Sequence, residues 1–208
     1  MYVIKQRINN MNNAQVVKDE QYNGLPLYNG KKASKGHYVD ILNRLYGILN
    51  YQVQKHNKVL VVRFDLHYPA VMNVMQCNSA ISQFYDRFTR NLKRNGADPK
   101  MLWVWEQCYS HNPHYHCMLT VDGNKHQRPH NLYAKAAEHW SRAIGVACNE
   151  VLVGYCNQAG PGYYNLRRND SDFGEIYNEC FERCSYLAKV RSKEGVPKEV
   201  HRHGGSRC

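Results

Sequence analysis

Residues 101–121 contain two apolar runs joined by a short polar turn, and this pair constrains the fold more than any other part of the chain. The first run is MLWVWEQC and the second is HYHCMLTV, with SHNP between them. Aromatic and β-branched residues in short runs are typical of strands, and a turn of this composition joins antiparallel neighbours. The segment therefore predicts a β-hairpin.

The rest of the chain alternates between helical and strand patterns. The predicted strands are 58–68, 101–108, 114–121 and 147–155, and the predicted helices are 37–55, 78–95, 131–144 and 172–193. Residues 157–170 are rich in glycine and tyrosine and predict a loop. Helices that alternate with hairpin-connected strands favour an α+β domain, with a central antiparallel sheet flanked by helices.

The two ends of the chain differ from its middle. Residues 1–35 are polar and predict an irregular N-terminal arm, residues 36–195 predict one folded domain, and residues 196–208 predict a C-terminal tail. The second His-x-His of the chain, at 201–203, has a charged middle residue and is expected to be solvated within that tail. No apolar run approaches the ~20 residues of a membrane helix and no signal core opens the chain, so we expect a cytoplasmic protein.

The charge balance favours a polyanionic partner. Lys and Arg number 28 against 17 Asp and Glu, which gives a formal net charge of +11. Nucleic acid is the natural partner, and a basic protein without such a partner is the alternative. The 16 tyrosines include some that could stack on unpaired bases, and others that pack in the core. The 8 cysteines include no Cys-x-x-Cys pair, so we expect reduced thiols.

Three residues of the hairpin form a candidate metal site. His114 and His116 are two apart on one strand, so their side chains project to the same face, while Tyr115 faces the other way. Glu106 on the preceding strand alternates with Trp105 and can lie beside them. Two histidines and one carboxylate can hold a divalent metal, Mg²⁺ or Mn²⁺, with open positions. Two alternatives remain: histidines that only hydrogen-bond across the sheet, and a zinc site that uses the neighbouring residues Cys108, His111 and Cys117.

The motif HYH before an apolar strand resembles the His-hydrophobe-His motif of the HUH endonuclease superfamily. VLVVRFDLHYP is similar to the first conserved strand of that fold, and WVWEQ followed by HYHCML resembles the replication-initiation family of filamentous phages (inoviruses) and prophages. The resemblance covers residues 58–193. It implies a ferredoxin/RRM-like core, a divalent metal bound by the two histidines and a third polar residue, and a nickase domain at 36–195.

The resemblance also implies a tyrosine nucleophile. YLAK at 186–189 matches the Tyr-x-x-Lys pattern of the superfamily. Tyr186 would attack the phosphate, and Lys189, on the same helical face, would stabilise the phenolate or bind the phosphate. Arg183 adds charge to that face. Tyr177 is the runner-up nucleophile, and its wide separation from Tyr186 favours a single-tyrosine enzyme.

Further residues are predicted to support the metal or bind DNA. Asp65 and His67 share one face of the first strand, which the resemblance places beside the metal, either to orient its ligands or to contact DNA. A polar pair at the surface is the alternative. The predicted loop carries an aromatic and basic set suited to single-stranded DNA: Tyr163, Tyr164, Arg167 and Arg168.

These features predict a sequence-specific single-strand DNA endonuclease that starts rolling-circle replication of a phage or mobile element in a bacterial cell. In the family, cleavage leaves a free 3′-OH and a 5′-phosphotyrosyl link. The chain contains no P-loop motif, so we expect a separate helicase. The alternatives are a non-catalytic DNA-binding regulator that keeps the basic fold, and a relaxase or single-strand transposase. The sequence sets no oligomeric state.

Overall fold

A computed structural model describes residues 14–107, 111–157 and 160–208 of the chain. The strands are β1 (Val16–Val17), β2 (Gln21–Tyr22), β3 (Leu25–Pro26), β4 (His37–Tyr38), β5 (Lys58–Leu66), β6 (Lys100–Glu106), β7 (His114–Asp122), β8 (Val153–Tyr155), β9 (Tyr163–Arg167) and β10 (His203–Gly205). The helices are α1 (Val39–Lys55), α2 (Ser79–Arg94), α3 (His130–Ile144) and α4 (Phe173–Ser185), with 3-10 helices at Lys31–Ala33, Glu150–Leu152 and Tyr186–Ala188.

The main sheet has six strands, and every pairing in it is antiparallel. Its order is β10-β6-β7-β5-β8, and β9 pairs with β5 beside β8. The long strand β5 therefore has β7 along one edge. Along its other edge, β9 pairs with residues 58–62 and β8 pairs with residues 64–66. This arrangement confirms the predicted α+β class with a central antiparallel sheet, and the predicted hairpin is the pair β6 and β7.

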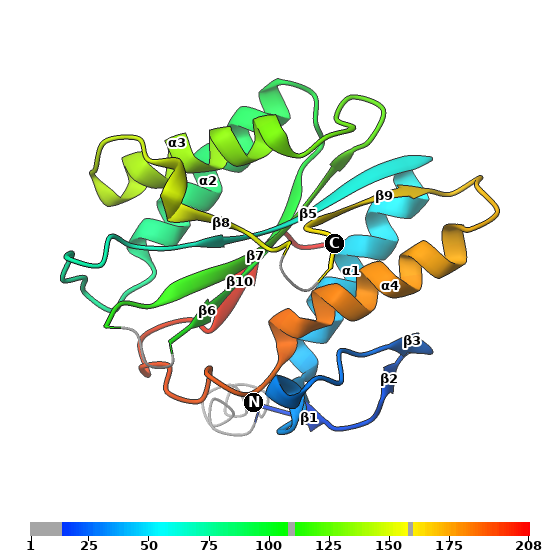
Figure 1. The fold of residues 1–208 in the computed structure, drawn as a ribbon, viewed down its shortest axis with the longest axis horizontal. Coiled ribbons are helices and arrows are strands. Elements are labelled where there is room, and N and C mark those ends of the chain that lie inside the picture. Colours follow the sequence, from blue (N-terminus) through cyan, green and yellow to red (C-terminus); the bar gives the residue numbers. More distant parts are fainter. Residues whose placement is uncertain (1–13, 108–110, 158–159) are drawn as a thin grey trace, which may run out of the picture.

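Helices cover both faces of the sheet (Figure 1). Helices α2 and α3 pack together on one face, and α1 and α4 lie on the other. The period-2 alternation of the strands decides which face each side chain reaches. On β6, Trp103 and Trp105 join the core under α2 and α3, whereas Leu102 and Val104 join the core under α1.

The helices follow the sequence patterns that predicted them. The apolar stripe of α1 is buried against the sheet: Ile41, Leu42, Leu45, Ile48 and Leu49. Helix α3 ends at Gly145, whose φ of 74° lies in the left-handed region where glycine avoids a steric penalty. Burial of one apolar face on the sheet, rather than helix propensity alone, stabilises these helices.

Several predicted boundaries are wrong. The helix predicted over 172–193 ends at Ser185 and passes into a 3-10 helix, and at this point the Ser185 hydroxyl donates to the Glu182 carbonyl and accepts from the Tyr28 amide. The strand predicted over 147–155 forms only at its last three residues, after a 3-10 helix. The predicted first strand ends at Leu66, before Tyr68.

The predicted tail and arm also contain regular structure. Residues 203–205 form β10 at the edge of the sheet, so the expectation of a solvated segment is wrong for Arg202 and His203, which are half-buried, whereas His201 is exposed. Gly204 permits this pairing, because a Cβ there would lie 2.4 Å from the Trp103 ring. The described part of the arm contains β1 to β3, and β1 pairs with β4. Cys108, which ends a predicted strand, and residues 158–159 of the predicted loop lie outside the described residues.

Two further expectations can be compared with the structure. Among the helices that the structure describes, none is long and apolar enough to cross a bilayer. The seven cysteines that can be assessed are free thiols, and three of them pack as small apolar groups in the cores: Cys117, Cys180 and Cys184.

Candidate metal centre

The register of three neighbouring strands gathers the predicted metal ligands. Glu106 of β6 lies opposite His114 of β7, and His116 lies opposite both Val104 of β6 and Asp65 of β5. One ligand atom from each of Glu106, His114 and His116 lies within 4.8 Å of the other two, so this group could hold a metal ion. All three residues project from the α1/α4 face, as the alternation with Trp105 and Tyr115 predicts.

The His116 ring is oriented for metal binding. Its Nδ1 lies 2.5 Å from Oδ1 of Asp65, which is the contact that orients histidine ligands in many metal sites. Its Nε2 is buried and has no hydrogen-bond partner in the described part of the chain, although it lies 3.0 Å from Oε2 of Glu106. Oε2 of Glu106 and Nε2 of His116 are close enough to share a cation, either a proton or a metal ion. The donor set therefore fits a divalent metal.

Glu106 is also the centre of a buried ionic network. Its Oε2 contacts the ammonium groups of Lys189 and Lys193, and the Lys193 distance is 2.9 Å. Only 1% of the Lys189 side chain and 0% of the Lys193 side chain are exposed, so both charges depend on this carboxylate. Burial would raise the pKa of Glu106, but His116 and the two lysines outweigh burial and hold it well below its ordinary value.

His114 completes the group from the outer side. Its Nε2 lies 3.9 Å from Oε1 of Glu106, and its ring stacks on His67 with the ring centroids 5.4 Å apart. Burial first, and the neighbouring His116 second, lower the pKa of His114 to about 4. The imidazole is therefore neutral near pH 7, which is the state that binds metals. His67, which follows β5, contacts His114, and Asp65 contacts His116, so both lie beside the candidate group.

Tyr186 lies against the candidate metal-ligand group, which consists of Glu106, His114 and His116. Its ring centroid is 5.5 Å from that of His116, and Nζ of Lys189 is 4.4 Å from the ring centroid. The tyrosine and the lysine are neighbours as predicted, although they belong to a 3-10 turn instead of a continuous α-helix. Burial, followed by the charge of Glu106, raises the pKa of Tyr186, so the phenol is protonated at neutral pH.

Arg63 is a part of this site that the sequence analysis missed. Its guanidinium carbon lies 5.3 Å from the Tyr186 ring centroid, and its Nη1 donates to the Arg183 carbonyl over 3.0 Å. The side chain is only 3% exposed. A usable signal was present, because an arginine inside the apolar run VLVVRFDL has to face a polar group or a ring when the strand is buried.

The predicted loop set divides into inward and outward residues. The segment is strand β9, so the loop prediction is wrong there. Tyr164 is buried and its hydroxyl donates to Glu179, while Arg168 donates to the Val53 and Gln54 carbonyls at the end of α1. Tyr164 is therefore not available for DNA, whereas Arg168 is exposed and is held to α1 through Nη1 alone. Tyr163 and Arg167 are exposed.

The remaining predicted residues are engaged with the protein. Arg183 donates to the Cys156 carbonyl over 2.9 Å and is half-buried. Tyr177, the runner-up nucleophile, is buried and donates to Asn50 over 2.8 Å. Cys117 packs in the opposite core, under α2 and α3, so the zinc alternative loses that ligand, and Cys108 lies outside the described residues.

Fold and site together define an α+β domain with a two-histidine, one-glutamate group that could hold a metal, beside a tyrosine. The chain belongs to the YagK/YfjJ C-terminal domain family, whose match extends over residues 17–206. It is 22% identical over 182 residues to the protein named "Uncharacterized protein YfjJ" of Escherichia coli (strain K12), covering 73% of this chain and 86% of that protein. No solved structure matches it.

Proposed function

We propose that this protein is a metal-dependent, single-tyrosine endonuclease of the HUH type that nicks single-stranded DNA. The observation that carries the proposal is the packing of Tyr186 against His116, with ring centroids 5.5 Å apart. This contact brings an oxygen nucleophile beside the group that could hold a metal ion. The net charge of +11 is consistent with a nucleic-acid substrate.

The roles of the residues follow from this arrangement. Glu106, His114 and His116 would hold Mg²⁺ or Mn²⁺, which would supply positive charge at the scissile phosphate. Oη of Tyr186 forms a bond to phosphorus while the bond from phosphorus to the 3′ oxygen breaks. The phenolic proton is transferred, in net, to that 3′ oxygen. The products are a 5′-phosphotyrosine and a free 3′-OH, which can prime replication.

Two cations flank the nucleophile. Lys189 and Arg63 lie 4.4 Å and 5.3 Å from the Tyr186 ring centroid. Their charges favour a phosphate at this position and stabilise negative charge on the phenolic oxygen as the proton leaves. This help is required, because burial raises the pKa of Tyr186 and keeps the free phenol protonated.

The test uses a pool of single-stranded oligonucleotides with randomised centres, incubated with the protein and Mn²⁺. With a label at the 3′ end, a 5′-phosphotyrosyl link carries the label to the position of the protein on a denaturing gel. With a label at the 5′ end, only a shortened free strand appears. His114→Ala and chelator should abolish both signals. Cleavage without a protein adduct would refute the tyrosine mechanism.

A non-catalytic DNA-binding protein is the second candidate. It is favoured by the buried contacts of Lys189 and Lys193, which already neutralise Glu106 without a metal. Such a protein would bind single-stranded DNA equally well with Mn²⁺ or with chelator, and calorimetry would detect no Mn²⁺ binding. Metal binding that His116→Ala abolishes would exclude this candidate.

A further inference from the structure

One line of residues follows the edge of β5 that faces away from β7. Antiparallel register places Arg167 opposite Lys58, Asn165 opposite Leu60, and Tyr163 opposite Val62. Strand β8 then continues the line, with Tyr155 opposite Phe64. These positions are two residues apart on β5, so all of them project from the same face of the sheet. We call this set the edge strip, and its members are Lys58, Arg167, Asn165, Tyr163 and Tyr155.

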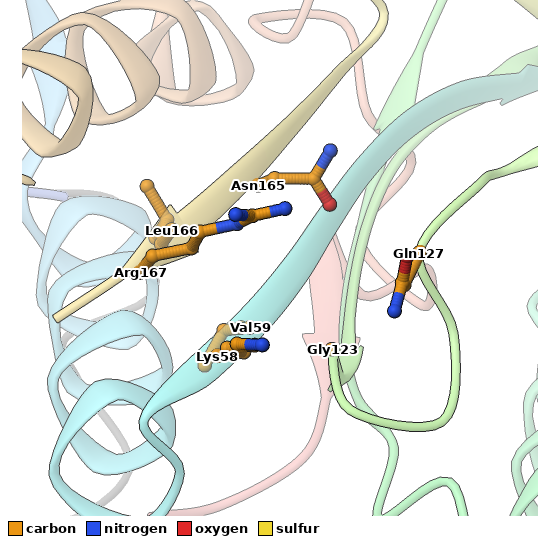
Figure 2. Close-up of a pocket in the computed structure, with 7 residues that line it drawn as sticks. All are labelled: Lys58, Val59, Gly123, Gln127, Asn165, Leu166 and Arg167. Carbon is orange, nitrogen blue, oxygen red and sulfur yellow. The ribbon is translucent and has the colours of Figure 1, made fainter. Parts of the chain in front are cut away.

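The edge strip is open to solvent. Tyr155 is 42% exposed and Tyr163 is 40% exposed, although both are large aromatic residues. Their partners on β5 are buried under α2 and α3, and one side of the Tyr155 ring packs against Tyr133 of α3, with the ring centroids 4.4 Å apart. At the other end, Lys58 and Arg167 line a shallow pocket together with Asn165 and Gln127 (Figure 2). In this view Asn165 and Arg167 extend from β9 towards β5, and Gln127 lies on the segment beyond β5.

The chemistry of the strip fits one ligand class. We propose that the edge strip binds single-stranded DNA, with Tyr155 and Tyr163 stacking on bases and Lys58 and Arg167 contacting phosphates. Exposed aromatic rings stack on bases only where these are unpaired. Within the described residues neither cation makes an ion pair, so both charges are available for phosphate. From residue 58 to residue 64, six strand steps span roughly 20 Å, enough for several nucleotides.

The strip also ends beside the candidate metal centre. Cys156 follows Tyr155 directly, and its thiol donates to Oδ1 of Asp65 over 3.3 Å. Asp65 in turn contacts His116. A strand that lies on the edge strip can therefore pass around the sheet edge at Tyr155 to reach Tyr186 on the other face. This part of the inference rests on the proposed function, whereas binding by the strip does not.

Anisotropy of a labelled oligo-dT 20-mer in EDTA measures binding without cleavage. We expect Tyr163→Ala and Tyr155→Ala each to weaken binding roughly tenfold, while Tyr163→Trp, which keeps a flat ring, retains it. Arg167→Ala should lower the slope of log affinity against log salt by ~0.7, the value for one single-strand phosphate. Lys32→Ala removes an exposed charge in the N-terminal arm and should leave the affinity within twofold.

The outcomes separate this inference from the nickase proposal. If a Tyr155→Ala, Tyr163→Ala, Arg167→Ala triple variant binds DNA with wild-type affinity, the proposal that the edge strip binds DNA is refuted. This holds even if the wild-type protein forms the covalent adduct with Mn²⁺. A duplex of the same length that binds as tightly as oligo-dT would also overturn it. Weaker binding of the triple variant supports the strip, and absence of any adduct would then refute only the nickase. Circular dichroism of each variant confirms that it is folded.

Discussion

Oδ1 of Asp65 lies 2.5 Å from Nδ1 of His116, and the two residues are directly opposite each other on β5 and β7. Burial would raise the pKa of Asp65, but His116 and Arg63 outweigh burial and lower it, so the carboxylate is ionised and accepts from Nδ1–H. Because Asp65 holds Nδ1, the other ring nitrogen, Nε2, faces Glu106. Asp65 thus orients the ring so that Nε2 can serve as a metal ligand.

Asp65→Asn should weaken Mn²⁺ binding by ~10–100-fold, the usual loss when the partner of a ligating histidine is changed. His116→Ala should abolish binding, because it removes the ligand itself. Isothermal titration calorimetry measures both effects. Asp86→Asn, which removes a surface carboxylate on α2, is the matched control and should bind like the wild type. Equal affinity in Asp65→Asn would show that Asp65 does not orient a metal ligand.

Glu106→Gln should destabilise the metal-free protein by ~3–5 kcal/mol, because it leaves the buried Lys189 ammonium without a counter-charge and Lys193, whose pKa burial lowers to about 7, without its hydrogen-bond acceptor. Lys193→Met should cost less, since Lys189 still neutralises Glu106. The double variant should therefore be more stable than the sum of the two single effects predicts. Urea unfolding in EDTA measures how far each single variant and the double variant lower the free energy of unfolding. Additivity within ~0.5 kcal/mol would show that Lys193 and Glu106 are not coupled.

The metal-ligand group could be predicted from sequence because it depends on local periodicity. Residues two apart on a strand share a face, and a short turn fixes which strand is the neighbour, so Glu106, His114 and His116 converge. The burial of Lys189 and Lys193 could not be predicted in the same way. It depends on where α4 ends, at Ser185. The Ser185 hydroxyl donates to the Glu182 carbonyl of the same helix and accepts from the Tyr28 amide of the N-terminal arm.

Pairing between distant segments explains the other missed elements. Strand β10 lies a hundred residues beyond β6, its partner, and its two glycines give no strand signal. Strand β9 had a weak signal, because Tyr164 and Leu166 alternate with the polar residues Asn165 and Arg167, but the preceding glycines and proline suggested a loop. In both strands the pairing with the sheet decides the structure, and local propensity does not.

Arg168→Ala should lower the free energy of unfolding by ~1 kcal/mol without changing affinity for single-stranded DNA. Its guanidinium donates to the Val53 and Gln54 carbonyls, which are among the unpaired acceptors of the last turn of α1. Arg167→Ala should show the opposite pattern, with normal stability and weaker binding. Urea unfolding and anisotropy on the same preparations distinguish the two arginines. Equal loss of binding in both variants would contradict the assignment of Arg168 as structural.

His37→Gln should flatten the loss of stability in mild acid. Burial, with a smaller contribution from Lys193, lowers the pKa of His37 from 6.5 to about 4. Between these values the unfolded chain binds a proton that the folded chain does not, so the free energy of unfolding falls as pH falls, by at most ~1.4 kcal/mol per pH unit. Urea unfolding at several pH values in EDTA measures the slope. His201→Gln, at an exposed position, should leave it unchanged.

Tyr186→Phe should retain the fold, Mn²⁺ binding and single-stranded DNA binding but form no covalent adduct, since it keeps the ring against His116 and removes only the attacking oxygen. Lys189→Ala should slow adduct formation by ~10²–10⁴-fold without abolishing it, because the ammonium assists the phenol and is not the nucleophile. Tyr177→Phe is the matched control, since the Tyr177 hydroxyl is already bonded to Asn50. Mass spectrometry of the nuclease-trimmed adduct identifies the linked residue. A nucleotide on Tyr177, or on any residue other than Tyr186, would refute the assignment, because only Tyr186 joins a phenol to the metal-ligand group in the described chain.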